Sequence, residues 1–267
     1  MMKNKVLKTL EDLCNCELKK IDIWFRANKL TANISKASKF MLSSASKTSR
    51  HNDFQIKMGD ANLERVKSIK YLGVMLDDQL SWDFHIQYLS KKLSSACGIL
   101  GKIKYYVDVP TLITIYHALF KSRLQYAIIC WGSANTTILQ SLRTIQNRAL
   151  RHISQATRYS KMDTVYLNYR ILKLDNLYVF ELGKFMYDYS KKCLPKSFEN
   201  CFPVVSHQRT RAATRGDLSI PRCNKVIGQK SIRYQGPKMW NEMSVEIKSA
   251  SKNIFKILLK NSIFSEL

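Results

Sequence analysis

The stretch that decides the fold runs from Ile138 to Ile153 and reads ILQSLRTIQNRALRHI. Its apolar residues recur at steps of three and four, which is the period of an α-helix with one buried face. An Asn-Thr-Thr run at residues 135–137 precedes it and is typical of a helix start. The opposite face is a basic ridge of Arg143, Asn147, Arg148 and Arg151. We therefore predict that Arg143, Arg148 and Arg151 contact nucleic acid.

The same period predicts further helices, over residues 7–28, 86–103, 110–120, 163–189 (as two helices) and 249–264. Pro110 is well placed at the start of its helix. Three short segments, 40–42, 54–58 and 69–74, are β-like and are separated by turn residues. The predicted fold class is α+β and mostly α-helical. A small antiparallel sheet comes first, and a helical region and a basic C-terminal region follow it.

The charge of the chain indicates a polyanionic partner. Lys and Arg number 44 against 20 Asp and Glu, which gives a formal net charge of +24. An excess of this size most often serves nucleic-acid binding, and the alternative is a basic protein without such a partner. Because 45% of the residues are hydrophobic, the chain can bury a core and is not expected to be disordered as a whole.

The sequence also indicates in which cellular compartment the protein lies and whether its cysteines bind a metal ion. No apolar run approaches the roughly 18 residues of a membrane span, and the N-terminus has no signal-peptide pattern. The seven cysteines are an odd number without zinc-site spacing, which favours free thiols. We expect an intracellular protein, nuclear or cytoplasmic, that has no membrane partner.

A second basic segment lies between Pro203 and Trp240, where helical periodicity is poor and an irregular structure is predicted. Its side chains suit phosphate binding and base stacking. In it, the predicted nucleic-acid contacts are Arg209, Arg211, Arg215, Arg233 and Tyr234. Gly236-Pro237 is predicted to form a turn, and Trp240 to pack in a core.

Three blocks of the sequence carry a family resemblance. They are WFRANKLTANISK from Trp24 to Lys36, YLGVMLD from Tyr71 to Asp77, and SIRYQGPKMWN from Ser231 to Asn241. In this order they resemble the C-terminal half of the reverse transcriptase of non-LTR (LINE-type, jockey-like) retrotransposons. The resemblance implies a palm remnant over residues 1–81, a helical thumb over 82–158, and a helical and basic C-terminal extension over 159–267. The intact family enzyme is an RNA-directed DNA polymerase that uses Mg²⁺ and deoxynucleotides.

The resemblance also implies roles for single residues. It places Lys36 at the lysine proposed to protonate the departing pyrophosphate, and Tyr71 and Gly73 in the hairpin that grips the primer terminus. An exposed loop lysine is the alternative for Lys36. Gly73 could let another backbone approach closely, or it could be a strand glycine needed only for local packing.

The metal-binding aspartates of the family are not expected in this chain. The Tyr/Phe-Ala-Asp-Asp signature does not occur in the sequence. The adjacent pair Asp77 and Asp78 is interpreted as turn residues, because neighbours on a strand point to opposite faces. We therefore expect no metal site and no cofactor in this fragment, and no polymerase activity of the fragment alone.

Three interpretations of function remain open from the sequence. The chain could be a truncated reverse transcriptase, a retained non-catalytic module that binds nucleic acid, or a gene-model fragment of a longer reading frame. The expected partners are RNA and DNA as template-primer, and the missing N-terminal portion of the polymerase.

Overall fold

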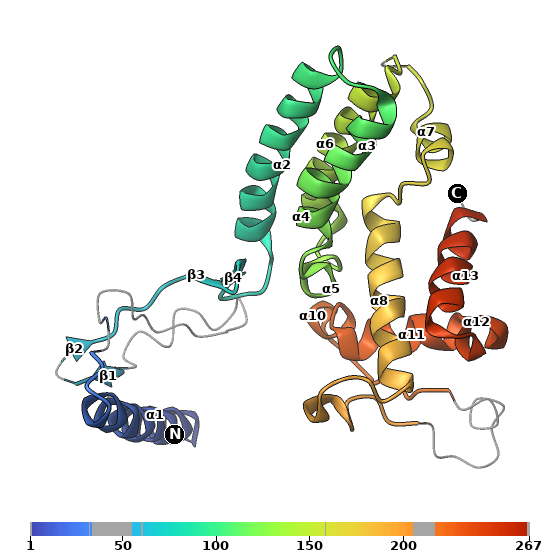
Figure 1. Cartoon of the computed structure of the whole chain (residues 1–267). Coiled ribbons are helices and arrows are strands. Elements are labelled where there is room, and N and C mark those ends of the chain that lie inside the picture. Colours follow the sequence, from blue (N-terminus) through green and yellow to red (C-terminus); the bar gives the residue numbers. More distant parts are fainter. Residues whose placement is uncertain are drawn as a thin grey trace. The chain divides into compact units, whose positions relative to one another are not determined.

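The computed structural model describes residues 2–31, 33, 55–59, 61–157, 159–204 and 217–265. The chain divides into two compact units, Met1–His85 and Ile86–Leu267, each of which is described by itself (Figure 1). Over the described residues the structure is mostly helical and has two small antiparallel sheets of two strands each. The predicted fold class is confirmed. No helix in these ranges is long and apolar enough to cross a membrane.

The first unit begins with a long helix, α1 (Met2–Ala27), as its apolar period predicts. Strands β1 (Lys57–Met58) and β2 (Ala61–Asn62) form a hairpin that lies against α1. The side chain of Asn15 joins the helix to this hairpin, since its Oδ1 accepts the N–H of Lys57 at 2.9 Å. The predicted β-like segment 40–42 lies outside the described residues.

Helix α1 keeps much of its apolar surface in contact with solvent. Leu13, Ile23 and Trp24 are exposed, and Leu18 and Phe25 are only half-buried. An amphipathic helix normally buries its apolar stripe against a core. Within the described residues, the hairpin of β1 and β2 covers only part of this stripe.

A second hairpin pairs β3 (Ser68–Tyr71) with β4 (Val74–Asp77). Leu72 and Gly73 form its two-residue turn with φ values of 45° and 82°, the left-handed values of a type I′ turn. The β-like segment predicted over residues 69–74 is therefore divided between two strands, because the chain reverses inside it, within the hairpin that the family resemblance implies. The sequence hides this turn, since leucine rarely adopts a positive φ.

His85 fixes the second hairpin to the first turn of α2 (Asp83–Ile103). Its Nδ1 accepts the N–H of Met75, on β4, at 3.3 Å. Burial lowers the pKa of the imidazole. At neutral pH the ring is uncharged and keeps this acceptor nitrogen available.

The second unit is built from helices. After α2, the elements are α3 (Val109–Tyr116), the π-helical turn η3 (His117–Lys121), α4 (Ser122–Gln125), α5 (Ile128–Trp131), α6 (Thr136–Ser154), α7 (Met162–Asn168), α8 (Leu174–Ser190), the 3₁₀ turn η4 (Lys196–Phe198), α10 (Val226–Gln229), α11 (Ile232–Glu242), α12 (Val245–Ser249) and α13 (Lys252–Ser265).

Helices α2 and α6 run parallel to each other. Near their starts, Ser90 Oγ lies 3.3 Å from Ser141 Oγ. Near their ends, Gly101 of α2 lies against the imidazole of His152. The predicted apolar stripes face the core here, and their most deeply buried members are Leu93, Leu100, Leu142 and Ile153.

The π-helical turn η3 joins α3 to α4 in one continuous helical rod. The buried side chains Leu112, Tyr116, Phe120 and Leu124 are spaced four residues apart throughout this rod. In a regular α-helix such spacing drifts around the axis by about 40° per step. A π turn has more residues per turn and drifts in the opposite sense. The π turn therefore keeps all four side chains on the core side.

Residues 226–242 correct another prediction. They form α10 and α11 instead of an irregular segment, and Gly236 and Pro237 are buried inside α11 instead of forming a turn. A Cβ on Gly236 would lie 2.7 Å from Met186 Sδ, so the glycine lets α11 pack closely on α8. Trp240 is buried beside Phe255 of α13 at 6.4 Å between ring centroids, which confirms its predicted role in packing.

Replacing Gly132 by alanine should destabilise the second unit. A Cβ there would lie 2.5 Å from Tyr178 Cδ2 and 2.6 Å from Ile128 O. We expect Gly132→Ala to lower the free energy of unfolding by about 1–3 kcal/mol, measured by guanidinium unfolding of the whole chain followed by circular dichroism. Gly98→Ala is the matched control, because a Cβ there meets nothing within 4 Å and should raise it by about 0.5–1 kcal/mol. Similar effects of the two substitutions would contradict this packing.

Low pH should weaken the hydrogen bond between Met75 of β4 and His85 of α2. Because the folded-state pKa of His85 lies below its unfolded value, its contribution is complete above the unfolded pKa of about 6.5 and is lost as the pH falls toward the folded pKa. Amide exchange at Met75 should therefore accelerate between pH 7.5 and pH 5.5, after correction for the intrinsic rate. In His85→Asn, whose side chain does not titrate, this acceleration should disappear. An unchanged acceleration in the variant would rule out His85 as the cause.

Candidate nucleic-acid interface

Asp77 organises the connection from the second hairpin to α2. It is 2% exposed, and its carboxylate accepts the backbone N–H groups of Gln79, Ser81 and Trp82 at 3.2, 2.7 and 2.7 Å. The carboxylate therefore satisfies backbone groups that the sharp turn would otherwise leave unpaired. This agrees with the structural interpretation made from the sequence.

The pair Asp77 and Asp78 does not fit a catalytic Mg²⁺ ion. The oxygens of Asp77 are committed to backbone donors, and an oxygen of Asp78 lies 4.0 Å from a guanidinium nitrogen of Arg65. In the part of the chain that the structure describes, no group of three or more His, Cys, Asp or Glu side chains is placed to hold a metal ion.

The predicted primer-grip residues lie at the tip of the second hairpin. Tyr71 is exposed at the end of β3. Gly73 occupies a turn position with a positive φ, so its structural role is in the turn and not within a strand. Lys36 lies outside the described residues, and its role stays a prediction.

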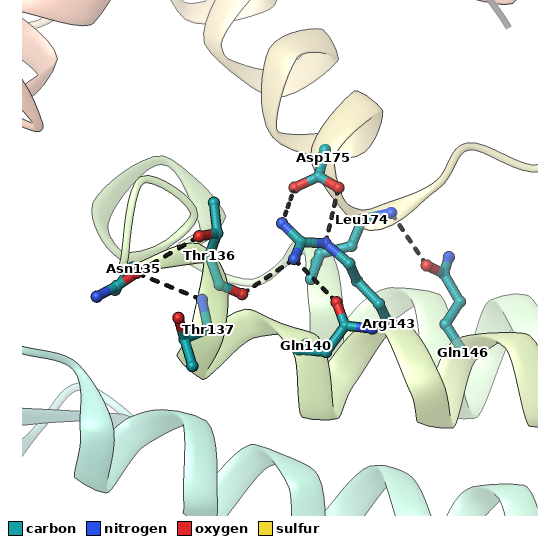
Figure 2. A network of polar contacts seen from close by, with 8 residues as sticks. All are labelled: Asn135, Thr136, Thr137, Gln140, Arg143, Gln146, Leu174 and Asp175. Atoms are coloured by element: carbon teal, nitrogen blue, oxygen red, sulfur yellow. Dashed lines mark hydrogen bonds and ion pairs between the residues drawn. The ribbon is translucent and has the colours of Figure 1, made fainter.

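Arg143 of the basic ridge is bound within the protein (Figure 2). Its Nε and Nη2 donate to the two carboxylate oxygens of Asp175 at 2.9 and 2.7 Å. Its Nη1 donates to Thr136 O at 3.0 Å and to Gln140 Oε1 at 3.3 Å. These contacts use four of the five N–H donors of a guanidinium. They join α6 to the first turn of α8, and a contact of Arg143 with nucleic acid stays a prediction.

Gln146 lies one turn further along α6 and is 1% exposed. Its Oε1 accepts the N–H of Leu174 at 3.0 Å, as Figure 2 shows. Its Nε2 donates to Tyr116 Oη and to Leu172 O, both at 3.0 Å. The side chain thus fixes the start of α8 against α6 and α3.

Arg148 and Arg151 lie in the last turns of α6, where they meet the end of α2. Arg148 is exposed and lies close enough to Cys97 of α2 to oppose the rise in the pKa of its thiol that burial causes. Arg151 is half-buried near Tyr166. Burial, together with the charges of Lys104 and Arg148, lowers the pKa of His152. Positive charge from both helices therefore accumulates at this end of the unit.

Two tyrosines beside these cations were not singled out from the sequence. Tyr105 and Tyr106 follow α2 and are 78% and 85% exposed. Lys104 Nζ lies 4.8 Å from the ring centroid of Tyr105. We call this surface the basic end; it consists of Lys102, Lys104, Tyr105, Tyr106, Arg148, Arg151 and His152. Exposed rings flanked by cations suit the stacking of bases and the binding of phosphates.

Helix ends alone do not account for the charge of the basic end. Each helix C-terminus carries roughly half a negative charge, about one charge for α2 and α6 together. Four cations, Lys102, Lys104, Arg148 and Arg151, lie there. The sequence does indicate a positively charged surface in this region, because residues 84–162 contain eleven Lys and Arg but a single acid, Asp108. The carboxylate of Asp108 caps α3 by accepting the N–H of Thr111.

The remaining predicted contacts lie elsewhere. Arg233 is exposed and Tyr234 is half-buried, both in the first turn of α11. Ser133 Oγ donates to Lys230 O at 2.8 Å, which places the start of α11 near the start of α6. Arg148 lies twelve residues after the start of α6, about 18 Å along its axis. The structure thus separates these two groups, and Arg209, Arg211 and Arg215 lie outside the described residues.

Loss of Arg143 should cost stability. Arg143→Gln removes the paired hydrogen bonds to Asp175, and we expect the free energy of unfolding to fall by about 1 kcal/mol. Arg148→Gln removes the same charge from an exposed site on the same helix and should change it by less than about 0.5 kcal/mol. Urea unfolding of both variants checks this. Equal losses would show that the Asp175 contact contributes nothing specific.

Comparison with known proteins gives a limited similarity. No family model matches the chain, and no solved structure matches it. Among curated proteins, the RNA-directed DNA polymerase from mobile element jockey of Drosophila funebris is 27% identical over 115 residues. The match covers 42% of this chain and 13% of that polymerase. Over this part of its length, the chain is similar to an RNA-directed DNA polymerase of a mobile element.

Proposed function

We propose that this chain is a non-catalytic piece of a non-LTR retrotransposon reverse transcriptase that binds RNA and DNA through its helical unit. The observation that carries the proposal is the basic end. There, cations at the ends of α2 and α6 lie beside the exposed tyrosines of the loop that follows α2. The similarity to the jockey polymerase supports the choice of nucleic acid over other polyanions. The division into palm remnant, thumb and C-terminal extension belongs to the same proposal.

The fold supplies the physical basis for binding. Parallel packing of α2 and α6 fixes the backbone positions of Lys102, Lys104 and Arg148. Each cation that contacts a phosphate releases counterions, which makes the affinity dependent on salt. The rings of Tyr105 and Tyr106 can stack on unpaired bases, an interaction that depends little on salt or on sequence. We therefore propose that the basic end binds a single-stranded segment.

The proposal excludes polymerisation by the residues of this chain alone. Nucleotide addition needs metal ions held by carboxylates. Asp77 uses its carboxylate for the backbone of a turn, and Asp78 faces Arg65. Tyr71 and Gly73 are proposed to contact the primer only when a complete polymerase centre is supplied.

Salt titration of binding tests the proposal. We expect the chain to bind a fluorescent single-stranded RNA with an affinity that falls steeply with salt. The triple variant Lys102→Gln, Lys104→Gln and Arg148→Gln should reduce the log–log slope by about two. Tyr105→Leu with Tyr106→Leu should weaken binding about tenfold or more at an unchanged slope. Fluorescence anisotropy measures both quantities.

The matched control changes three exposed lysines outside the basic end, Lys191, Lys192 and Lys196, to glutamine. This triple variant should bind RNA with nearly the wild-type slope. A similar slope loss in both triple variants would mean that only overall charge matters. No binding at low salt would refute the function, and incorporation of deoxynucleotides with Mg²⁺ in a primer-extension assay would refute the non-catalytic assignment.

A further inference from the structure

A second group of cations converges away from the basic end. His117 and Lys121 lie on η3, Arg170 lies in the connection between α7 and α8, and Lys260 lies on α13. All four line one cavity of about 10 Å³, together with Tyr116 and Gln146. This volume has room for about one water molecule. Three segments that are far apart in the sequence thus bring positive groups to a single place.

The cations are held in position by neighbouring groups. Arg170 donates from Nη2 to Asn261 Oδ1 at 2.7 Å, and its guanidinium carbon lies 5.6 Å from the centroid of the Phe264 ring. Lys260 Nζ lies 5.6 Å from the same ring. Gln146 closes the inner side, where its hydrogen bonds are already made within the protein.

Acidic side chains do not balance this charge inside the cavity. Its lining residues in the described part of the chain include no Asp or Glu. The carboxylate of Glu181, which is not among the lining residues, attracts the ammonium group of Lys121. It is already bound by Lys184 Nζ at 2.7 and 3.0 Å and by Gln125 Nε2 at 2.8 Å.

The titration of these groups reflects their crowding. Burial lowers the pKa of Lys121, and the charge of Lys184 adds to this effect while Glu181 opposes it. Burial and the charges of Lys121 and Arg170 lower the pKa of Lys260. Burial and the charges of Lys121 and Lys260 lower the pKa of His117. A bound anion would offset the repulsive part of each shift.

We propose that Lys121, Arg170 and Lys260 bind one phosphate group on the open side of this cavity, which is too small to enclose it, with His117 beside the site. A phosphate group offers several acceptor oxygens and negative charge, which match an arginine fork and two ammonium groups. The phosphate could be inorganic phosphate or a phosphodiester of a nucleic-acid strand. The second source rests on the proposed function, whereas the site itself does not.

The test measures the His117 imidazole by NMR in the whole chain. Adding millimolar inorganic phosphate should raise the pKa of His117, because the anion stabilises the imidazolium. The double variant Lys121→Gln and Lys260→Gln should bind phosphate at least about tenfold more weakly. Lys192→Gln with Lys196→Gln is the control with the same charge change and should behave like the wild type. Circular dichroism confirms that each variant is folded.

The same variants distinguish the two sources. If the site holds a phosphodiester, Lys121→Gln with Lys260→Gln should weaken RNA binding and reduce the salt slope by about one. Unchanged RNA binding combined with lost phosphate binding would assign the site to a free phosphate. A His117 pKa that does not respond to phosphate in the wild type would overturn the site. RNA binding through the basic end would then still stand.

Discussion

The helical unit depends on the buried side chain of Gln146. Its amide makes three hydrogen bonds, to Tyr116, Leu172 and Leu174, and the residue is 1% exposed. A buried amide that lost one of these partners would leave a polar group unpaired at a cost of about 1–3 kcal/mol. The packing of α6 against α3 and α8 must therefore keep all three partners within hydrogen-bonding distance of the amide. This constraint fixes α3, α6 and the start of α8 as one body.

Both proposed binding surfaces take their geometry from that body. Arg143 lies one turn before Gln146 and clamps the first turn of α8 through Asp175. Gln146 itself lines the cavity of Lys121, Arg170 and Lys260, and the basic end lies at the far end of the same helix. One helix thus carries structural and ligand-facing polar groups on different sides. The division follows from which groups meet α8 and which meet solvent.

The sequence predicted the helices whose apolar residues recur at steps of three and four, such as α2 and α6. It did not predict α11, because Gly236 and Pro237 are strong local turn signals whereas the close packing against Met186 is a tertiary effect. The local sequence pattern missed the turn at Leu72 and Gly73, because leucine gives no signal for a left-handed conformation. Only the family resemblance implied a hairpin there. Gln146 and Arg143 could be placed on α6, but their partners near residue 174 could not be read from periodicity. The basic end was only partly foreseen, since it requires the parallel pairing of α2 and α6.

The π-helical turn at His117–Lys121 has a consequence for how this chain should be aligned with others. A turn of this kind holds one residue more than a regular α-helical turn. A homologue that lacks one residue there could close the rod into an uninterrupted α-helix while keeping Leu112 and Tyr116 in register with α6. Alignments of this region should therefore allow a single-residue gap inside the helix, at a place where gaps are normally penalised.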